Sequence, residues 1–413
     1  MNVTITPALL KGTITPPPSK SQAHRLIIAA ALSDGVCRLS NVELSQDIQA
    51  TLRCMRTLNA DASSDGTVIR GCNLVDGFEV PPPEIMDCGE SGSTLRFLIP
   101  VALALQGGGK FTGHGRLMER PQGPYFDLFR EKGIACSLED GVLTVSGKLT
   151  PGEYALPGDV SSQFVTGLLY ALPLLEGDSE IQLTTGLESR GYVDMTLDAL
   201  AQFGVSVDYD GDRRFRVPGN QVYQHRDLAI EADWSNADFW YAARLLGCQV
   251  EAAGLNPASV QGDRVIAAFC DRLRESGPVE LDVSQCPDLV PPLAAMAALR
   301  DRETTRIGNA ARLRMKESDR LSTVTEVLSA LGADIEEQAD ALVIRGKAKL
   351  PGGVTVSGHN DHRIAMMAAI AATNCDAPVT ITGAECVRKS YPNFWADYEA
   401  LGGVIARTEE AQP

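Results

Sequence analysis

Small polar residues recur together with basic residues at several predicted helix starts in this chain. These starts read Ser19-Lys20-Ser21, Gly89-Glu90-Ser91-Gly92-Ser93-Thr94, Asp159-Val160-Ser161-Ser162-Gln163, Asp233-Trp234-Ser235-Asn236 and Asn360-Asp361-His362-Arg363. Serine, aspartate and asparagine cap helices, and a helix start carries free N–H groups and a partial positive charge that attract anions. Capping alone explains any one of these segments, but their recurrence beside basic residues predicts an anion-binding site.

The basic residues near these starts can each be read as an ordinary solvated surface charge. They are Lys20, Arg25, Arg96, Arg120, Arg190, Lys316, Arg320, Arg363 and Lys389. The formal net charge of the chain is −16. Small anions therefore bind only if the cations gather in one place and locally reverse the field of the protein. We predict that they gather at one cleft.

Two carboxylates are candidates for proton transfer. Asp288 follows Pro287 at the start of a predicted buried helix, and Glu317 lies in Lys316-Glu317-Ser318-Asp319-Arg320. An aspartate at a helix start is often only a cap, and the charged run also fits a surface ion-pair cluster. If both face a bound anion, they supply the acid and the base that a proton-transfer reaction needs.

Metal and nucleotide chemistry find no support in the motifs. His359 and His362 are three residues apart, whereas the helical zinc motif spaces its histidines four apart with a glutamate between them. The chain has neither a Gly-x-Gly-x-x-Gly segment after a strand nor a P-loop. We expect no metal and no cofactor.

The elements that position these residues repeat along the chain. An amphipathic helix, a stop and one or two strands recur six times, with stops at Asn59-Ala60, Gly133, Gly204, Gly277, Gly332 and Gly402. A second kind of helix, apolar on all sides and therefore buried, lies between the copies. These helices are predicted at residues 26–32, 95–105, 164–175, 239–246, 289–299 and 364–372. The pattern predicts an α/β protein of two similar domains, each of three copies.

Length, charge and cysteine usage exclude several other classes of function. The length of 413 residues favours more than one domain, and no apolar run is long enough for a membrane helix. The acidic balance argues against nucleic acid as a partner. The ten cysteines form no Cys-x-x-Cys pair and Met1 to Ile5 does not resemble a signal peptide, so we expect free thiols and a cytoplasmic location.

The combined segments resemble one family, the 5-enolpyruvylshikimate-3-phosphate synthases, which are 3-phosphoshikimate 1-carboxyvinyltransferases. The resemblance runs from Pro18 to about Pro392. It rests on Ser19 to Ser21 with Arg25, Gly89 to Arg96, Glu119 to Pro121, Ser161 to Gln163, Pro287-Asp288, Lys316 to Arg320, Asn360 to Arg363, and Lys389 to Pro392. Their shared order along the chain makes the resemblance specific.

The resemblance implies an inside-out α/β barrel in two domains, each of three βαβαββ units, with the active site in the cleft between them. The N-terminal domain is expected at residues 17–225. The C-terminal domain is expected at residues 1–16 and 226–413. Two linking strands, near Pro16 to Pro18 and near His225-Arg226, form the implied hinge.

The resemblance also assigns site residues. Those implied to bind shikimate-3-phosphate are Lys20, Ser21, Arg25, Ser161, Ser162, Gln163, Ser189, Asp288 and Lys316. Those implied to bind phosphoenolpyruvate are Lys20, Gly92, Arg120, Gln163, Arg320, Arg363 and Lys389. The implied catalytic residues are Asp288, Glu317 and Lys20. Arg312 stands where some members place a substrate-binding asparagine, so that contact is not assigned.

The implied reaction joins the 5-hydroxyl of shikimate-3-phosphate to C2 of phosphoenolpyruvate while C3 gains a proton, and the adduct then loses inorganic phosphate. Whether Glu317 or a lysine protonates C3 stays open.

We expect a monomer that acts on these two small molecules, and we expect glyphosate to compete with phosphoenolpyruvate. One alternative is enolpyruvyl transfer to UDP-N-acetylglucosamine, whose enzymes carry a loop cysteine that is missing between Arg116 and Arg120. The other is a non-catalytic anion-binding relative.

Overall fold

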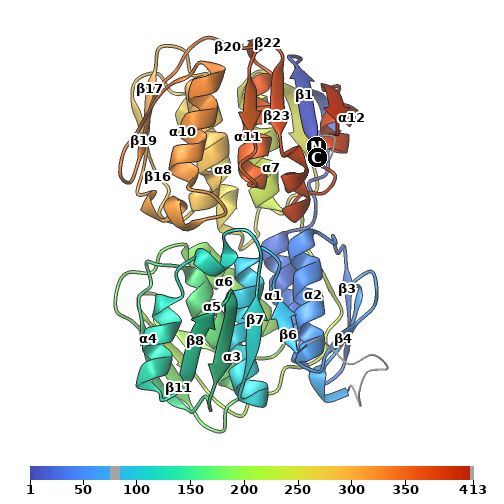
Figure 1. Ribbon diagram of the computed structural model, residues 1–413, viewed down its shortest axis with the longest axis vertical. Helices are drawn as coiled ribbons and strands as arrows, with labels where there is room; N and C mark the ends of the chain where they lie inside the picture. The colour runs from blue at the N-terminus through green and yellow to red at the C-terminus, as the bar shows by residue number, and fades with distance from the viewer. Residues whose placement is uncertain (75–83, 410–413) are drawn as a thin grey trace. The chain divides into compact units, whose positions relative to one another are not determined.

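The computed structural model describes residues 1–74 and 84–409. The chain forms two compact units. The N-terminal unit comprises Pro18–Glu231, and the C-terminal unit comprises Met1–Pro17 and the chain from Ala232 onward. Both units are α/β, as predicted, and Figure 1 shows helices and strands alternating along each of them.

The boundary between the units differs from the prediction. The sequence placed it after His225, but residues 226–231 belong to the N-terminal unit. The reason is strand pairing, because β14 (Leu228–Ala229) pairs in parallel with β3 (Val36–Ser40). Pro17 lies instead with the C-terminal unit, where its carbonyl oxygen accepts a hydrogen bond from Asp233 N at 2.8 Å.

Three four-stranded sheets build the N-terminal unit. Their strand orders are β14-β3-β5-β4, β6-β7-β9-β8 and β10-β11-β13-β12. In each sheet the first two strands are parallel and the last two form an antiparallel pair. The other strands are β4 (Asp61–Ala62), β5 (Val68–Arg70), β6 (Ile85–Asp87), β7 (Gly108–Thr112), β8 (Ala135–Glu139), β9 (Val142–Ser146), β10 (Gly152–Leu156), β11 (Ser179–Leu183), β12 (Asp208–Tyr209) and β13 (Arg214–Val217).

The C-terminal unit repeats this plan with one shorter copy. Two of its sheets have four strands, in the orders β16-β17-β19-β18 and β21-β23-β1-β24, and the other two are the strand pairs β2-β15 and β20-β22. The strands are β1 (Asn2–Thr6), β2 (Lys11–Ile14), β15 (Gln249–Ala252), β16 (Val279–Asp282), β17 (Thr304–Gly308), β18 (Asp334–Glu337), β19 (Leu342–Arg345), β20 (Leu350–Gly352), β21 (Thr355–Ser357), β22 (Cys375–Ala377), β23 (Val379–Thr382) and β24 (Val404–Thr408). The copy that contains β2 and β15 has no antiparallel hairpin between residues 253 and 278, all of which the structure describes. Gly277 and Gly332 are therefore closer in sequence than the other stops.

The helices predicted to be buried form the core of each unit. They are α1 (Lys20–Ala31), α3 (Gly92–Gln106) and α5 (Ser162–Ala171) in one unit, and α7 (Trp234–Leu245), α9 (Val290–Ala298) and α11 (His362–Ala372) in the other. Every residue of α9 and of α11 is buried. Because these helices are surrounded on all sides, only their ends are available to bind ligands. That is why their N-termini matter for the site.

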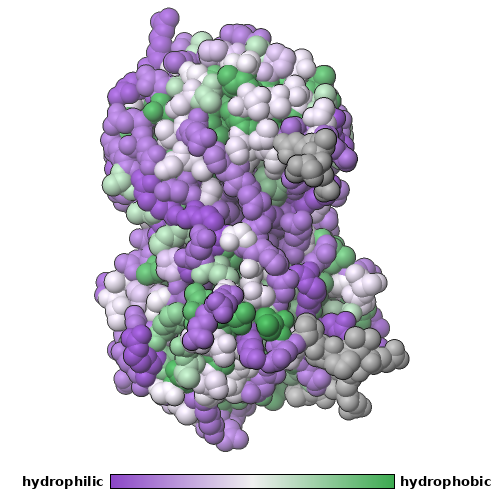
Figure 2. All heavy atoms as spheres, viewed as in Figure 1, coloured by the Kyte–Doolittle hydropathy of each residue, from purple (hydrophilic) through white to green (hydrophobic). Residues whose placement is uncertain are grey.

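The amphipathic helices cover the core. They are α2 (Gln46–Thr57), α4 (Gly123–Glu131), α6 (Arg190–Gln202), α8 (Ile266–Arg274), α10 (Arg320–Leu331) and α12 (Phe394–Ala400). The predicted stops after them are confirmed, since Asn59 and the five glycines all have positive φ angles. Figure 2 shows mostly hydrophilic side chains on the visible face of each unit, with apolar atoms in separate patches. Among the described helices, none is both long and apolar enough to cross a membrane.

Close helix packing in the N-terminal unit depends on Gly167. A Cβ atom built on Gly167 in α5 would overlap Tyr125 Oη and the carbonyl oxygen of Arg96 in α3. We therefore expect Gly167→Ala to lower the free energy of unfolding by roughly 2 kcal/mol or more, since overpacking a close contact typically costs 1–3 kcal/mol. Denaturant unfolding measures the change. Gly186→Ala is the matched control, because a Cβ there meets nothing within 4 Å; equal stabilities would contradict the assignment.

Candidate active site

The structure brings the predicted site residues together in two groups, one in each unit. We call them the N-terminal half-site and the C-terminal half-site. The first contains Lys20, Ser21, Arg25, Gly92, Arg120, Ser161, Ser162, Gln163 and Ser189. The second contains Asp288, Lys316, Glu317, Arg320, Arg363 and Lys389.

Serine side chains cap the three core helices that begin at the N-terminal half-site. Ser19, Ser91 and Ser161 accept hydrogen bonds from Gln22 N, Thr94 N and Gln163 N at 3.3, 3.1 and 3.3 Å. Each cap satisfies one of the free N–H groups in its first helical turn. The remaining first-turn N–H groups and the partial positive charge are the features by which a helix start attracts an anion.

Gly92, Arg120 and Gln163 meet at the start of α3. A Cβ atom on Gly92 would lie 3.0 Å from Arg120 Nη1 and 3.2 Å from Gln163 Oε1. The amide of Gln163 is held in place because its Nε2 donates to Ser93 Oγ at 3.1 Å and its Oε1 accepts from Arg96 Nη1 at 2.8 Å. A guanidinium and an amide therefore lie directly beside a helix N-terminus that has no side chain at its first residue.

Arg96 connects this part of the site to the loop that carries Arg120. Its Nη2 donates to the carbonyl oxygen of Pro121 at 3.0 Å, and its guanidinium lies 4.7 Å from the centre of the Phe164 ring. Arg96 was noted in the sequence as a cation near a helix start, without a binding role. Its contacts make it a support for Gln163 and for the residues that follow Arg120.

Lys20 and His24 join α1 to α2 one helical turn apart. Lys20 Nζ lies 2.8 Å from Asp47 Oδ2, and His24 Nδ1 lies 2.7 Å from Thr51 Oγ1. A short hydrogen-bonded chain continues to α3, because Thr51 Oγ1 is 2.7 Å from Thr94 Oγ1. Thr94 in turn donates to Ser91 Oγ at 2.7 Å.

Proton positions along this chain follow from the donor count. Since the hydroxyl of Thr94 donates to Ser91, the hydroxyl of Thr51 must donate to Thr94, and His24 Nδ1–H must donate to Thr51. His24 Nε2 is then a bare acceptor that is buried without a hydrogen-bond partner among the described residues. Burial and the charges of Lys20 and Arg25 lower the pKa of His24 well below its usual value, which keeps the ring neutral.

Arg25 donates most of its N–H groups to acceptors within the protein. Its Nε, Nη1 and Nη2 donate to Thr196 Oγ1, to the carbonyl oxygen of Ser21 and to that of Tyr192, at 2.9, 2.7 and 2.8 Å. The side chain is 2% exposed and its guanidinium lies 5.3 Å from the centre of the Phe97 ring. The structure therefore places Arg25 beside the site with several of its N–H groups already bonded to the protein.

Ser189 begins α6 in the left-handed region, with φ of 54°. The segment before it lies against the loop that leads to Ser161, because Glu188 N donates to the carbonyl oxygen of Gly158 at 3.1 Å. The starts of α5 and α6 are thereby brought to the same end of the sheet that contains β10 and β11.

A buried guanidinium organises the C-terminal half-site. Arg320, 1% exposed, donates from Nη1 to Asp288 Oδ1 at 2.8 Å and from Nη2 to Glu317 Oε2 at 2.7 Å. Its Nε and Nη2 also donate to Asp361 Oδ2 and Oδ1, at 2.8 and 3.2 Å. These bonds account for four of the five N–H groups of the side chain. Burial would lower the pKa of Arg320, but the three carboxylates raise it above its usual value.

Asp288 is surrounded by cations. Lys316 Nζ lies 3.3 Å from its Oδ1, and Arg363 Nη2 lies 3.7 Å from its Oδ2. Burial raises the pKa of Asp288, but Lys316, Arg363 and Arg320 outweigh burial and hold it well below the usual range. These cations therefore favour the ionised form of Asp288.

Arg363 and Lys389 lie at the start of α11. Asp361 caps this helix, and Arg363 Nη1 donates to the carbonyl oxygens of Ser235 and Asp288, both at 3.1 Å. Lys389 is 4% exposed and its Nζ donates to the carbonyl oxygen of Asn360 at 2.6 Å. Backbone oxygens thus hold both cations in place at a helix N-terminus.

Several residues of the two half-sites were missed as individual functional candidates. Asp361 had the clearest signal, because it occupies the capping position of the segment Asn360-Asp361-His362-Arg363. Asp47 and His24 gave no local signal, since their partners lie on other helices. Ser235 lies in a predicted helix start, but nothing in the sequence linked it to Arg363. Arg312, to which no contact was assigned, donates through Nη2 to the carbonyl oxygen of Ser284.

The histidine pair of the sequence does not form a metal centre. His359 Nε2 lies 3.3 Å from Glu326 Oε1, whereas His362 is buried in the first turn of α11. Within residues 1–74 and 84–409, no group of three histidine, cysteine, aspartate or glutamate residues is arranged to hold a metal ion.

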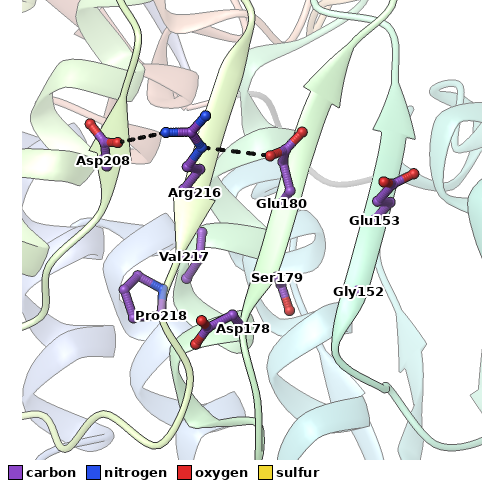
Figure 3. Close-up of a pocket in the computed structure, with 9 residues that line it drawn as sticks. All are labelled: Gly152, Glu153, Asp178, Ser179, Glu180, Asp208, Arg216, Val217 and Pro218. Carbon is purple, nitrogen blue, oxygen red and sulfur yellow. Dashed lines mark ion pairs between the residues drawn. The ribbon is translucent and has the colours of Figure 1, made fainter.

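A groove on one face of the sheet β10-β11-β13-β12 contains none of the predicted site residues. Figure 3 shows a row of charged side chains across its strands, in which Arg216 lies between Glu180 and Asp208. Arg216 Nε is 3.8 Å from Glu180 Oε2, and Nη1 is 3.6 Å from Asp208 Oδ2. Arg216 is the one basic residue beside four carboxylates in the lining, so the groove is acidic and lacks the cationic character of the half-sites.

The fold is that of the enolpyruvyl transferases. It is shared with the EPSP synthase of Acinetobacter baumannii, at a TM-score of 0.78 and 24% identity, covering 98% of this chain and 100% of that chain. It is also shared with the enolpyruvyl transferase NikO of Streptomyces tendae, at a TM-score of 0.77 and 17% identity, covering 98% of each chain.

Sequence comparison identifies the family. The model for EPSP synthase (3-phosphoshikimate 1-carboxyvinyltransferase) matches residues 5–398. A 3-phosphoshikimate 1-carboxyvinyltransferase of Clostridium kluyveri is 46% identical over 422 residues, covering 98% of both chains. The enzyme of that name from Clostridioides difficile is 43% identical over 426 residues, covering 97% of both. The chain belongs to the EPSP synthase family.

The series of hydrogen bonds that runs from His24 to Ser91 predicts a specific pH dependence of stability. The unfolded histidine titrates near pH 6.5, and the folded one titrates lower, so acid favours the unfolded state. His24→Asn keeps an N–H donor for Thr51 but does not titrate. As the pH falls from about 6.5 to the pKa of His24 in the folded protein, we expect the free energy of unfolding of wild type to decrease by up to about 1.4 kcal/mol per pH unit more than that of His24→Asn. Denaturant unfolding at several pH values measures this difference.

His24→Leu separates the hydrogen bond from the titration. It removes both, so near pH 7 it should be less stable than His24→Asn by roughly 1–3 kcal/mol, the cost of leaving a buried polar group without its partner. Equal stability of the two variants, or wild-type acid sensitivity in His24→Asn, would contradict the assigned chain.

Proposed function

We propose that this protein transfers the enolpyruvyl group of phosphoenolpyruvate to the 5-hydroxyl of shikimate-3-phosphate and releases inorganic phosphate. One observation carries the proposal. Both candidate acids, Asp288 and Glu317, bond to the same buried Arg320. Two carboxylates fixed on one guanidinium, with Lys316 beside them, supply proton acceptors and donors at one place next to cations that bind anions.

The C-terminal half-site suits the enolpyruvyl donor. Arginines bind carboxylates through paired hydrogen bonds, and Arg320 and Arg363 both contact Asp288. Arg120, Gly92 and Gln163 of the N-terminal half-site form a second anion site at a helix N-terminus, which suits a phosphate. We propose that both half-sites act on one bound pair of substrates, and that the capped starts of α1 and α5 bind shikimate-3-phosphate.

Proton transfer is coupled to ligand binding in this proposal. The cations that hold the pKa of Asp288 low are the residues proposed to bind the anionic substrates. When Lys316, Arg320 and Arg363 contact those anions instead, the pKa of Asp288 rises and the carboxylate becomes a better base for the 5-hydroxyl. Oxygen then bonds to C2 as C3 gains a proton. In the second stage C3 returns a proton, the bond from C2 to the phosphate oxygen breaks, and inorganic phosphate leaves.

We further propose that the protein works as a cytoplasmic monomer in the shikimate pathway of aromatic amino-acid biosynthesis. All ten cysteines are free thiols, which suits a reducing compartment. The residues proposed to contact both substrates come from a single chain, so the proposal requires no second subunit.

Release of inorganic phosphate tests the reaction. The protein is mixed with phosphoenolpyruvate and either shikimate-3-phosphate or UDP-N-acetylglucosamine. Phosphate released only with shikimate-3-phosphate supports the proposal. Release only with UDP-N-acetylglucosamine would replace it with the other transferase reaction, and release with neither acceptor would favour a non-catalytic anion-binding protein.

Asp288→Asn tests the proposed base. The change keeps the size and the helix-start position, so the protein should fold, but an amide cannot take the hydroxyl proton. We expect the turnover number to fall by roughly a hundredfold or more. Thermal unfolding confirms that the variant is folded, and near wild-type turnover would contradict the role of Asp288.

Gly92→Ala tests the phosphoenolpyruvate site. The added methyl would press on Arg120 Nη1 and Gln163 Oε1. Glyphosate is longer than phosphoenolpyruvate, so we expect the inhibition constant for glyphosate to rise by a larger factor than the KM for phosphoenolpyruvate. Steady-state inhibition kinetics on both proteins measure the two factors. Equal factors would mean that Gly92 does not face the bound ligand.

A further inference from the structure

Asp238 is a buried carboxyl group that the proposed mechanism does not use. It lies on α7, it is fully buried, and neither of its oxygens has a hydrogen-bond partner within the described part of the chain. Its Oδ2 lies 3.5 Å from Arg363 Nη1. An unsolvated carboxylate without hydrogen bonds is costly, so its place beside a proposed substrate-binding arginine calls for a physical explanation.

The absence of a hydrogen bond from Arg363 to Asp238 follows from the donor count. Nη1 of an arginine carries two hydrogens, and here Nη1 donates to the carbonyl oxygens of Ser235 and Asp288, both at 3.1 Å. The guanidinium therefore offers Asp238 its charge but no proton from Nη1. Attraction by charge alone must compensate the burial of the ionised form.

The surroundings of Asp238 oppose ionisation further. Burial raises the pKa of Asp238 well above its usual range, Arg363 lowers it, and nearby carboxylates raise it again. The element α9 has no charged residue, and Glu251 of β15 is exposed. The ionisable groups that face Asp238 are Arg363 of α11, Asp263 of η4 (Gly262–Val265), Asp233 at the start of α7, Asp288 of η5 (Pro287–Leu289) and Cys270 of α8.

We propose that Asp238 is a positioning residue that couples phosphoenolpyruvate binding at Arg363 to the uptake of a proton, which rests on the function proposed above. Ionised Asp238 competes with the substrate anion for the charge of Arg363. Neutral Asp238 leaves that charge to the substrate and lets the guanidinium keep its two backbone contacts. The anion and the proton therefore stabilise each other's binding.

The direction of the pH effect follows from linkage. A bound anion near Arg363 favours the neutral form of Asp238, so its pKa is higher in the complex than in the free protein. Between these two pKa values, the KM for phosphoenolpyruvate rises with pH, by at most about tenfold per pH unit for one proton. The substrate has its own ionisation, but it is the same for every variant, so a difference between variants reports on Asp238.

The experiment compares wild type with Asp238→Asn, an isosteric side chain that stays neutral. The KM for phosphoenolpyruvate is measured from pH 5.5 to 8.5 at saturating shikimate-3-phosphate. We expect the KM of Asp238→Asn to rise less steeply than that of wild type, with similar values for both proteins at low pH. Asp271→Asn is the matched control, because Asp271 is an exposed carboxylate on the neighbouring helix α8. It should keep the wild-type slope.

Two results would overturn the proposal. Equal slopes would show that Asp238 does not titrate with binding, and a higher KM in Asp238→Asn at every pH would show that Asp238 acts as an ionised partner of Arg363. If Asp238→Asn does not fold, calorimetric titration of wild type with phosphoenolpyruvate alone, in buffers of different ionisation enthalpy, decides the question. The titration is run at pH 8, where the substrate phosphate is fully ionised, on wild type and on Asp288→Asn. Proton uptake that persists in Asp288→Asn supports the proposal and its absence overturns it. This titration needs no turnover, so it separates failure of this proposal from failure of the proposed reaction.

Discussion

The ion pairs of buried Arg320 hold in place the segments of the C-terminal unit that contain the candidate acids. A guanidinium that is 1% exposed needs acceptors for its hydrogens and negative charge to replace water. Asp361 at the start of α11, Glu317 before α10 and Asp288 in η5 supply both. Removing one of these partners would leave a buried charge unbalanced. The helix starts are therefore held together by the same contacts that fix the positions of the two candidate acids.

The N-terminal unit reaches a similar result mainly by hydrogen bonds. Its core helices begin with serine caps, and the chain from His24 through Thr51 and Thr94 to Ser91 joins α1, α2 and α3 by neutral groups. The same repeating architecture thus carries two kinds of site. Neutral caps form one kind of candidate site, whereas the ion cluster holds carboxylates that we propose exchange protons. This division matches a reaction in which anions are bound at both half-sites and the candidate acids lie in one.

The acidic character of the whole chain and the cationic character of its half-sites are compatible because of where the charges lie. Many of the surplus carboxylates occupy exposed positions on strands and amphipathic helices, where water screens them, as in the groove of Figure 3. Arg320, Arg363 and Lys389 are buried at helix N-termini. In a less polar environment, each of these cations attracts a nearby anion more strongly than a water-screened carboxylate on the surface repels it. Local placement therefore outweighs net charge.

The sequence by itself determined the features that depend on short-range physics. Helix caps such as Ser91, the six stops and the apolar helices each follow from residues within one or two turns, and all were predictable. So were the motifs that carry the family resemblance, including Asp288 and Lys316 to Arg320. Long-range pairing leaves no such local pattern. Only the tertiary structure decided that β14 pairs with β3, that one repeat lacks its hairpin and that Arg25 bonds largely within the protein. It also decided that His24 contacts Thr51 and that Asp238 lies beside Arg363. Each of these features depends on a partner that folding brings near.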